Sequence, residues 1–257
     1  MSDTPGRCRI GVQLWPQATT TDALRRAAQD AEAAGIDSVW IWDHFYPLRG
    51  DPEAAHFESW TLLSAIAAET DRVQLGHLVG SAGFRNPHLV ADMARTLDHV
   101  SHGRFVLGLG AGWFRRDYEE YEFPYHATGT RVRELDTYLY RVRRRLQRLT
   151  PPPVGPLPIL IGGMGEKVTL RVVARHADIW NATGSPEQFA RAGAVLDGWC
   201  EQEGRDPGSI ARTVHIALED ADRVGEYVAA GAEHLMIQCP HPFDLEPARR
   251  MLAAVGG

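Results

Sequence analysis

The segment Trp42-Asp43-His44-Phe45 places an acid beside a histidine directly after an apolar run. Histidine titrates near neutral pH and is the side chain that most often moves protons in enzymes. Asp43 could orient the imidazole, so Asp43 and His44 are candidates for acid–base chemistry. The alternative is a pair that only ties down a loop. The two residues alone leave both interpretations open.

Two glycine-containing segments, residues 80–87 and 108–113, also follow apolar runs. Small residues let a flat ligand approach the backbone, although a plain turn needs them as well. The second segment fails as a dinucleotide fingerprint, because Trp113 stands where the last glycine should be. Arg85 could bind an anionic ligand or make a structural salt bridge. The candidate ligand contacts are Leu78, Val79, Gly80, Arg85, Asn86, Gly110, Ala111 and Gly112.

A third segment, residues 162–167, precedes a helix-like stretch. Consecutive glycines and free amides at a helix N-terminus suit an anionic phosphate, with a simple glycine turn as the competing interpretation. Asn181 and Thr183 add short polar side chains after the next apolar run. The candidate phosphate contacts are Gly162, Gly163, Gly165 and Glu166.

Other motifs are excluded or carry little chemistry. Cys8, Cys200 and Cys239 are widely spaced and form neither a disulfide framework nor a zinc pattern, so we expect no metal. The arginine-rich stretch 141–148 fills the polar face of an amphipathic helix, which does not favour nucleic-acid binding. We expect His215 and His234, which lie within apolar runs, to be structural.

Eight strand-like runs alternate with helix-like segments along the chain. Residues 89, 93, 97 and 100 form one apolar stripe, and residues 135, 139, 142, 146 and 149 form another. Ser185-Pro186-Glu187-Gln188 is a capping box with proline at the first helical position. The expected strands are residues 9–14, 38–42, 73–79, 105–109, 158–162, 178–181, 212–218 and 234–238.

Eight β–α units within 257 residues favour a closed parallel barrel over an open sheet. We therefore predict an α/β protein, a single (β/α)₈ TIM barrel over residues 1–257. Such barrels carry their sites at the carboxyl ends of the strands. Residues 111–129 form the one long irregular stretch and are rich in aromatics, which is typical of a functional loop.

The composition narrows the function classes. A net charge of −6 argues against a general binder of nucleic acid or anionic membranes. No apolar run approaches the ~20 residues that cross a bilayer, and the first residues lack the apolar core of a signal peptide. We expect a soluble cytoplasmic protein with a small-molecule substrate.

These segments together resemble the luciferase-like monooxygenase superfamily, and within it the oxidoreductases that depend on a deazaflavin, coenzyme F-420. The resemblance covers roughly residues 9–182. Its segments include 42–45, 58–63, 70–76, 84–87, 97–104, 108–113 and 159–167.

The resemblance implies a luciferase-like barrel, commonly a homodimer, with a flavin or deazaflavin in the barrel mouth. Asp43-His44 would lie beside the reactive ring, and Gly162-Gly163 near the phosphate tail. A bulge with a non-proline cis peptide would support the ring's far face, with Leu78-Val79-Gly80 as the match.

Two departures from the family pattern bear on activity. The sugar-phosphate dehydrogenase branch has a catalytic glutamate at the position of Trp113 and a substrate-facing tryptophan at that of Leu48, so that activity is not expected here. The connections after the fourth helix and after the seventh strand are shorter than in relatives, which would open the mouth of the barrel.

Three functions remain open at this point. The first is hydride transfer between F-420 and a small organic substrate, with His44 exchanging a proton, Asp43 orienting His44, and Trp113 shielding the site from water. The second is an FMN-dependent monooxygenase of the luciferase type. The third is a catalytically silent barrel that binds a flavin or deazaflavin.

Overall fold

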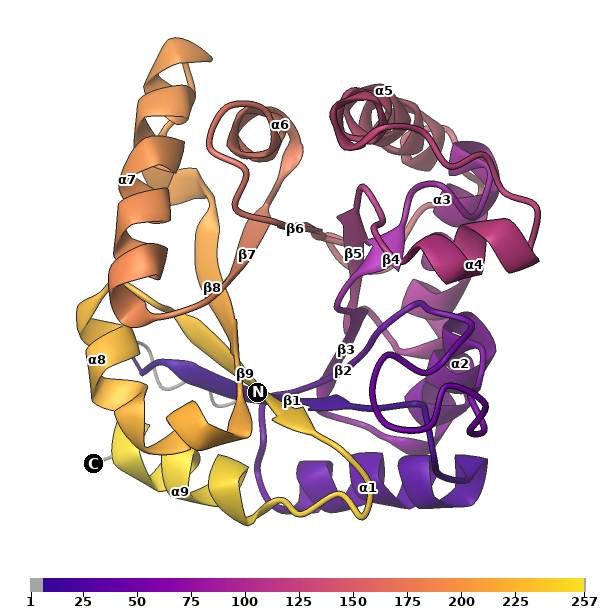
Figure 1. The fold of residues 1–257 in the computed structure, drawn as a ribbon, viewed down its shortest axis with the longest axis vertical. Coiled ribbons are helices and arrows are strands. Elements are labelled where there is room, and N and C mark those ends of the chain that lie inside the picture. Colours follow the sequence, from indigo (N-terminus) through magenta and orange to yellow (C-terminus); the bar gives the residue numbers. More distant parts are fainter. Residues whose placement is uncertain (1–6, 257) are drawn as a thin grey trace.

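The computed structural model describes residues 7–256, and these form a closed barrel of parallel strands (Figure 1). β1 pairs with both β2 and β9, and β3 pairs with β5, so the sheet closes on itself. This confirms the predicted (β/α)₈ architecture. The strands are β1 (Arg9–Leu14), β2 (Ser38–Ile41), β3 (Gln74–His77), β4 (Gly80–Ser81), β5 (Phe105–Gly110), β6 (Ile159–Gly162), β7 (Ile179–Thr183), β8 (Ala211–Ile216) and β9 (His234–Cys239).

The third barrel position differs from the single strand expected over residues 73–79. It is split into β3 and β4, and the peptide bond between Leu78 and Val79 is cis. The non-proline cis peptide implied by the family resemblance is therefore present at Leu78-Val79.

Helices surround the barrel, as Figure 1 shows. Asn86 caps α3 through its side chain, and Ser185 with Gln188 forms the predicted capping box at the start of α7. The helices are α1 (Thr21–Ala33), α2 (Ser59–Glu69), α3 (Pro87–Val100), α4 (Arg115–Glu120), α5 (Thr128–Leu146), α6 (Thr169–His176), α7 (Pro186–Gln202), α8 (Val224–Ala229) and α9 (Glu246–Val255), with short 3-10 turns at Pro207–Ser209 and Leu218–Arg223.

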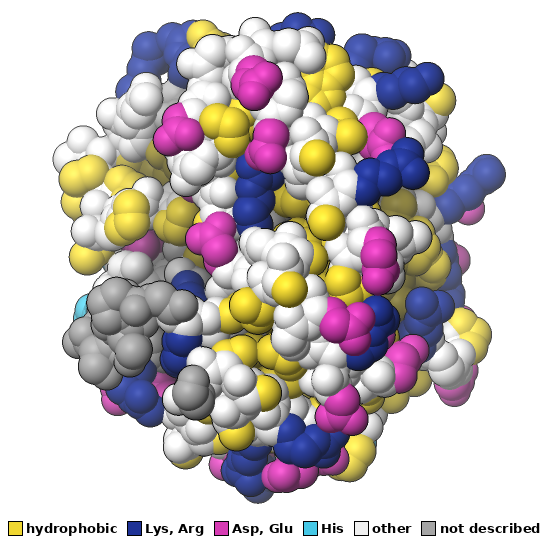
Figure 2. All heavy atoms as spheres, turned by 90° about the vertical axis from the view of Figure 1, so that its left-hand side faces the viewer, with side chains coloured by type: hydrophobic (Ala, Val, Ile, Leu, Met, Phe, Trp, Pro, Cys, Tyr) yellow, Lys and Arg dark blue, Asp and Glu magenta, His cyan; other side chains and the backbone are white. Residues whose placement is uncertain are grey.

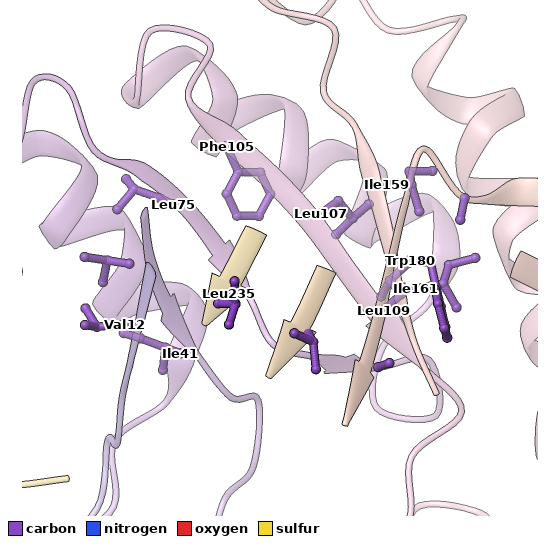
Figure 3. Close-up of a cluster of buried hydrophobic side chains, with 14 of the residues drawn as sticks. Val12, Ile41, Leu75, Phe105, Leu107, Leu109, Ile159, Ile161, Trp180 and Leu235 are labelled. Atoms are coloured by element: carbon purple, nitrogen blue, oxygen red, sulfur yellow. The ribbon is translucent and has the colours of Figure 1, made fainter. Parts of the chain in front are cut away.

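The buried side chains fall into two groups, because successive strand residues point to opposite faces. One group lies between the strands and the helices, and includes Val12, Ile41 and Phe105 (Figure 3). A smaller group plugs the barrel interior and contains Trp40, Leu78, Val106, Leu160 and Met236. The plug leaves the space above it, at the carboxyl ends of the strands, for a site.

The apolar stripe predicted for α3 was right for Met93 and Leu97, which pack against the core, and wrong at its two ends. Leu89 is 53% exposed and Val100 is 37% exposed. The fully buried positions are Val90, Ala91, Ala94, Leu97 and Asp98, of which Leu97 was predicted. Small alanines let α3 lie close to the barrel, so apolar size alone misidentifies the inner face.

The surface mixes charges of both signs. On the face shown in Figure 2, basic and acidic side chains lie interspersed rather than in one block. Within residues 7–256, no helix is long and apolar enough to cross a membrane.

Candidate active site

A cavity of about 520 Å³ opens at the carboxyl ends of the strands. Strands from all sides of the barrel contribute to it: Gln13 from β1, Gly110 from β5, Asn181 from β7 and Gln238 from β9. The predicted site residues that line it are Asp43, His44, Leu78, Val79, Gly80, Gly110, Ala111, Gly112, Trp113, Gly162, Gly163, Asn181 and Thr183. Most of the residues chosen from strand ends therefore meet in one place.

His44 is held by Asp117, not by its neighbour Asp43. The Nδ1 atom of His44 lies 2.6 Å from Oδ2 of Asp117, whose side chain is fully buried. The other Asp117 oxygen accepts a hydrogen bond from the Phe45 backbone at 3.1 Å. A carboxylate can only accept, so the Nδ1 of His44 carries the proton and donates it. The prediction that Asp43 orients His44 was therefore wrong.

Asp43 lines the cavity as well, but it belongs to a separate hydrogen-bond network. Its Oδ1 accepts from the Ser59 hydroxyl at 2.8 Å, and its Oδ2 pairs with Arg85 at 2.6 Å. Arg85 also pairs with Glu58 at 2.8 Å. Burial, the largest single influence, raises the pKa of Asp43, but the positive charge of Arg85 together with the hydrogen bonds from Arg85 and Ser59 outweighs it and lowers this pKa below its usual value. Asp43 therefore remains an anion inside the fold.

The glycines of β5 and β6 make room for Val79. A Cβ added to Gly110 would lie 2.8 Å from Cγ2 of Val79, and one added to Gly162 would lie 3.1 Å from its Cγ1. The space beside these glycines is therefore filled by the Val79 side chain, which itself lines the cavity. The expectation that Gly110 leaves open space for a ring was therefore wrong, because Val79 occupies that space.

Gly110→Ala tests this packing. The added methyl would push Val79 from its place, at about 1–3 kcal/mol of overpacking, and deform the cavity wall. We expect a lower melting temperature together with weaker binding of F-420 or FMN in a titration. Gly198→Ala is the matched control, because nothing lies within 4 Å of its added Cβ, and it should retain both properties. Unchanged cofactor affinity in Gly110→Ala would show that Val79 is not part of the binding surface.

Aromatic rings surround His44 on the open side of the cavity. Trp113 and Phe114 lie edge-on to His44 with ring centroids 5.7 Å away in both cases. Trp113 is 61% exposed, so it borders the entrance rather than sealing it. The loop before α4 thus places two rings beside His44, and their role in shielding the site from water stays a prediction.

The luciferase-like monooxygenase family model matches residues 7–254 of this sequence. The chain belongs to this family. It is 30% identical over 218 residues to the pyrimidine monooxygenase RutA of Escherichia coli strain K12, an alignment that covers 75% of this chain and 54% of RutA. This luciferase-like chain thus spans about half the length of the curated relatives it matches.

Solved structures share the fold of this luciferase-like barrel. An F-420-dependent secondary alcohol dehydrogenase aligns with a TM-score of 0.86 at 16% identity, covering 97% of this chain and 98% of the other. The F-420-dependent tetrahydromethanopterin reductase from Methanopyrus kandleri aligns at 0.72 with 15% identity and the same coverage. EDTA monooxygenase from Chelativorans sp. BNC1 aligns at 0.67 with 16% identity, covering 88% and 67%.

Four predicted cofactor contacts lie away from the cavity wall of this luciferase-like barrel. Arg85 forms salt bridges with Asp43 and Glu58, as in the structural alternative to anion binding. Asn86 caps α3. Gly165 and Glu166 lie in the loop before α6, where Glu166 pairs with Arg191 at 2.9 Å. Their positions favour structural roles.

Several cavity residues were not predicted. His215, expected to be structural, lines the cavity at the end of β8. Gln13 and Gln238 lie at neighbouring strand ends, and the period-2 pattern of each strand could have identified them as inward-facing. Thr169 at the start of α6 also lines the wall. In residues 7–256 no group of three or more metal-ligating side chains gathers.

Proposed function

We propose that this luciferase-like protein is an oxidoreductase that transfers a hydride between coenzyme F-420 and a small organic substrate. The observation that carries the proposal is His44 in the wall of the cavity, with its Nδ1 held 2.6 Å from the buried carboxylate of Asp117. The bound cofactor would supply the hydride chemistry, and the protein would supply binding, orientation and the proton.

The cavity suits a tricyclic ring with one polar edge. Its volume of about 520 Å³ lies within the usual range for small-molecule sites, about 300–1,000 Å³. Leu78 and Val79 offer an apolar surface to a ring. The side-chain amide of Gln238 lines the cavity and makes no hydrogen bond among residues 7–256, so it is free to bind polar ligand atoms. Gln13 lies beside it and donates to the Leu78 carbonyl at 2.8 Å.

The hydrogen bond to Asp117 defines what His44 can do. With the proton on Nδ1, the neutral ring leaves Nε2 as an acceptor, and the protonated ring offers Nε2–H as a donor. His44 would therefore exchange one proton with the substrate at Nε2, while Asp117 fixes the tautomer and stabilises the imidazolium. Asp43 would support the wall without taking part in this exchange.

Glycine-rich backbone next to Thr169 and Thr183 would take the phosphate of the cofactor. Gly162, Gly163, Thr169 and Thr183 all line the cavity. Hydroxyls and backbone amides near a helix start are favourable for phosphate oxygens. Both F-420 and FMN carry such a phosphate, so this part of the wall supports either cofactor.

FMN-dependent monooxygenation is the second candidate. It is favoured by the 30% identity to a pyrimidine monooxygenase, whereas the two F-420-dependent structures share the fold over nearly the whole chain. We place F-420 first because the alignments with the two F-420-dependent structures cover 97% of this chain and 98% of each of the other two chains. Neither of those chains therefore carries a large additional segment.

Parallel titrations of the purified protein with F-420 and FMN would test the assignment. We expect quenching or a shift of F-420 fluorescence at micromolar protein, with weaker binding of FMN. Tighter binding of FMN would support the monooxygenase, and no response to either would contradict both. Stoichiometric F-420 binding without turnover of enones, alcohols or imines would favour the silent barrel.

A further inference from the structure

Arg49 is a cation in the cavity wall without a partner of its own. It follows β2 and lines the cavity, and its guanidinium makes no hydrogen bond or ion pair with any residue in the described range 7–256. The carboxylate in the same wall, Asp43, is already paired with Arg85 at 2.6 Å. Arg49 is an exposed residue that lines the cavity, and no residue in the range 7–256 compensates its positive charge.

The carboxylates nearest to Arg49 in sequence are engaged elsewhere. Asp51 accepts a hydrogen bond from the Glu53 backbone at 2.9 Å. Glu53 pairs with Arg116 at 2.6 Å, and the same arginine binds the Pro52 carbonyl. In the structure neither carboxylate contacts Arg49, so the guanidinium is open to an anion from outside this loop.

The backbone under Arg49 is fixed by Gln17, a buried residue of the preceding β–α loop. The Gln17 amide donates to the Arg49 carbonyl at 2.7 Å, and its oxygen accepts from the Leu48 amide at 2.8 Å. One side chain thus holds the backbone of two successive residues, Leu48 and Arg49. Arg49 is consequently presented from an anchored position, which reduces the entropy lost when it binds a ligand.

Aromatic surface adjoins this cation within the same cavity. Trp15 and Trp42 line the wall with ring centroids 5.2 Å apart. The indole nitrogen of Trp42 donates to Nε2 of His56 at 2.9 Å, which fixes its ring. Leu48 adds an aliphatic face. A ligand that suits this corner has a flat apolar body and one negative group.

The glycine-rich wall lies across the barrel from Arg49. In the strand order, β2 is separated from β6 by β3 and β5 on one side, and from β7 by β1, β9 and β8 on the other. A phosphate bound near Gly162 and Thr169 would therefore occupy the opposite rim (Figure 1). This leaves Arg49 for a different anion.

We propose that Arg49 binds the carboxylate of a small organic acid, which is the substrate of the site. The inference rests on the proposed oxidoreductase function and narrows its substrate to acids with a flat apolar body. Arg49 pairs with the carboxylate, and Trp15, Trp42 and Leu48 contact the apolar part. Arginine suits this role because its planar donor pair matches the two carboxylate oxygens.

Benzoate and benzamide, which differ mainly in charge, are suitable probes. Both are titrated into the full chain by calorimetry, with saturating F-420 and again without it. We expect benzoate to bind about tenfold more tightly than benzamide, as a charge-assisted pair of about 1.4 kcal/mol would give. Arg49→Met should abolish this preference, and Arg49→Lys should retain part of it. Arg141→Met is the control, because Arg141 is exposed on α5 and away from the cavity.

The outcomes separate the possible sources of the anion. Loss of the benzoate preference in Arg49→Met, with F-420 affinity unchanged, supports the proposal. Weaker F-420 binding with the benzoate preference intact would assign Arg49 to the cofactor and overturn it. The proposal would also be overturned if Arg49→Met changed neither the benzoate preference nor the F-420 affinity. The same holds if the parent protein showed no preference for benzoate over benzamide. Absence of F-420 binding would contradict the proposed function, whereas the titration without cofactor would still test Arg49.

Discussion

Replacing His44 with alanine is expected to lower kcat by about 10²–10⁴-fold, the usual contribution of a positioned acid–base group. Cofactor affinity should be largely kept, because the wall contacts of Leu78, Val79 and Gly163 do not depend on the imidazole. The measurement is steady-state turnover of a substrate identified by screening small organic acids with a flat apolar body, together with a fluorescence titration of F-420.

Asp117→Asn shows whether the two residues act as a unit. An amide in place of the carboxylate can donate to Nδ1 of His44, which would move the proton to Nε2 and give the wrong tautomer. We therefore expect a large loss of kcat in the single variant. The double variant His44→Ala/Asp117→Asn should be no slower than His44→Ala alone, because residues that act together show non-additive effects.

Additive losses would indicate that Asp117 acts through the fold and not through His44. Full turnover in His44→Ala would remove His44 from the reaction altogether. Ser64→Ala is a useful control, because that hydroxyl bonds only the Trp60 carbonyl within α2 among residues 7–256 and should leave turnover unchanged.

The barrel was predictable from the sequence because its signals are local. Each strand is a short apolar run, and several helices carry their own cap or stripe, as with Ser185 and Gln188. Eight repeats of this order leave few topologies, and closure follows from their number. The strand-end rule then brought Asp43, His44 and the glycine segments to one rim.

The partner of His44 was not predictable in the same way. Asp117 lies 73 residues further along the chain, in the aromatic stretch where no periodic pattern fixed the structure. The adjacent Asp43 was the nearer choice in sequence, yet its carboxylate is taken by Ser59 and Arg85. Which of two acids a histidine meets depends on how a loop folds over the barrel.

The roles of the glycines depended equally on contacts between distant segments. Gly110 and Gly162 accommodate the side chain of Val79 from a third segment. Glycine patterns in sequence show that something must approach the backbone, but not whether it is a ligand or another side chain. Arg49 gave no signal in sequence, because what distinguishes it is the lack of a partner among residues 7–256 in the folded protein.

Acidification from pH 7 to pH 5 should destabilise the protein through histidines that are buried in neutral form. Burial lowers the pKa of His77 from 6.5 to about 4, and that of His56 likewise to about 4. Burial also lowers the pKa of His234 well below its ordinary value. In the unfolded chain these imidazoles would take up protons near pH 6.5.

The sign of the effect follows from proton counting. Between pH 6.5 and pH 4 the unfolded chain binds protons that the folded chain does not, so the free energy of unfolding falls as the pH falls. Each such histidine contributes about 1 kcal/mol per pH unit within that window. Carboxylates whose pKa is lowered in the folded protein, such as Asp43, also reduce the free energy of unfolding on acidification. They do so only at lower pH, near the pKa that carboxylates have in the unfolded chain. The range from pH 6.5 to pH 5 therefore isolates the histidines.

His77→Gln provides the sharpest test of this mechanism. The Nε2 of His77 lies 3.1 Å from the Ser59 hydroxyl, which itself donates to Asp43, so the imidazole must be the donor in this contact. A glutamine amide can supply a donor without titrating. Urea unfolding at pH 7, 6 and 5 should show a pH slope reduced by about one proton in His77→Gln. The slope should be unchanged in His88→Gln, since His88 is exposed on α3. A parent protein equally stable at pH 7 and pH 5 would rule out buried neutral histidines as the source of acid sensitivity.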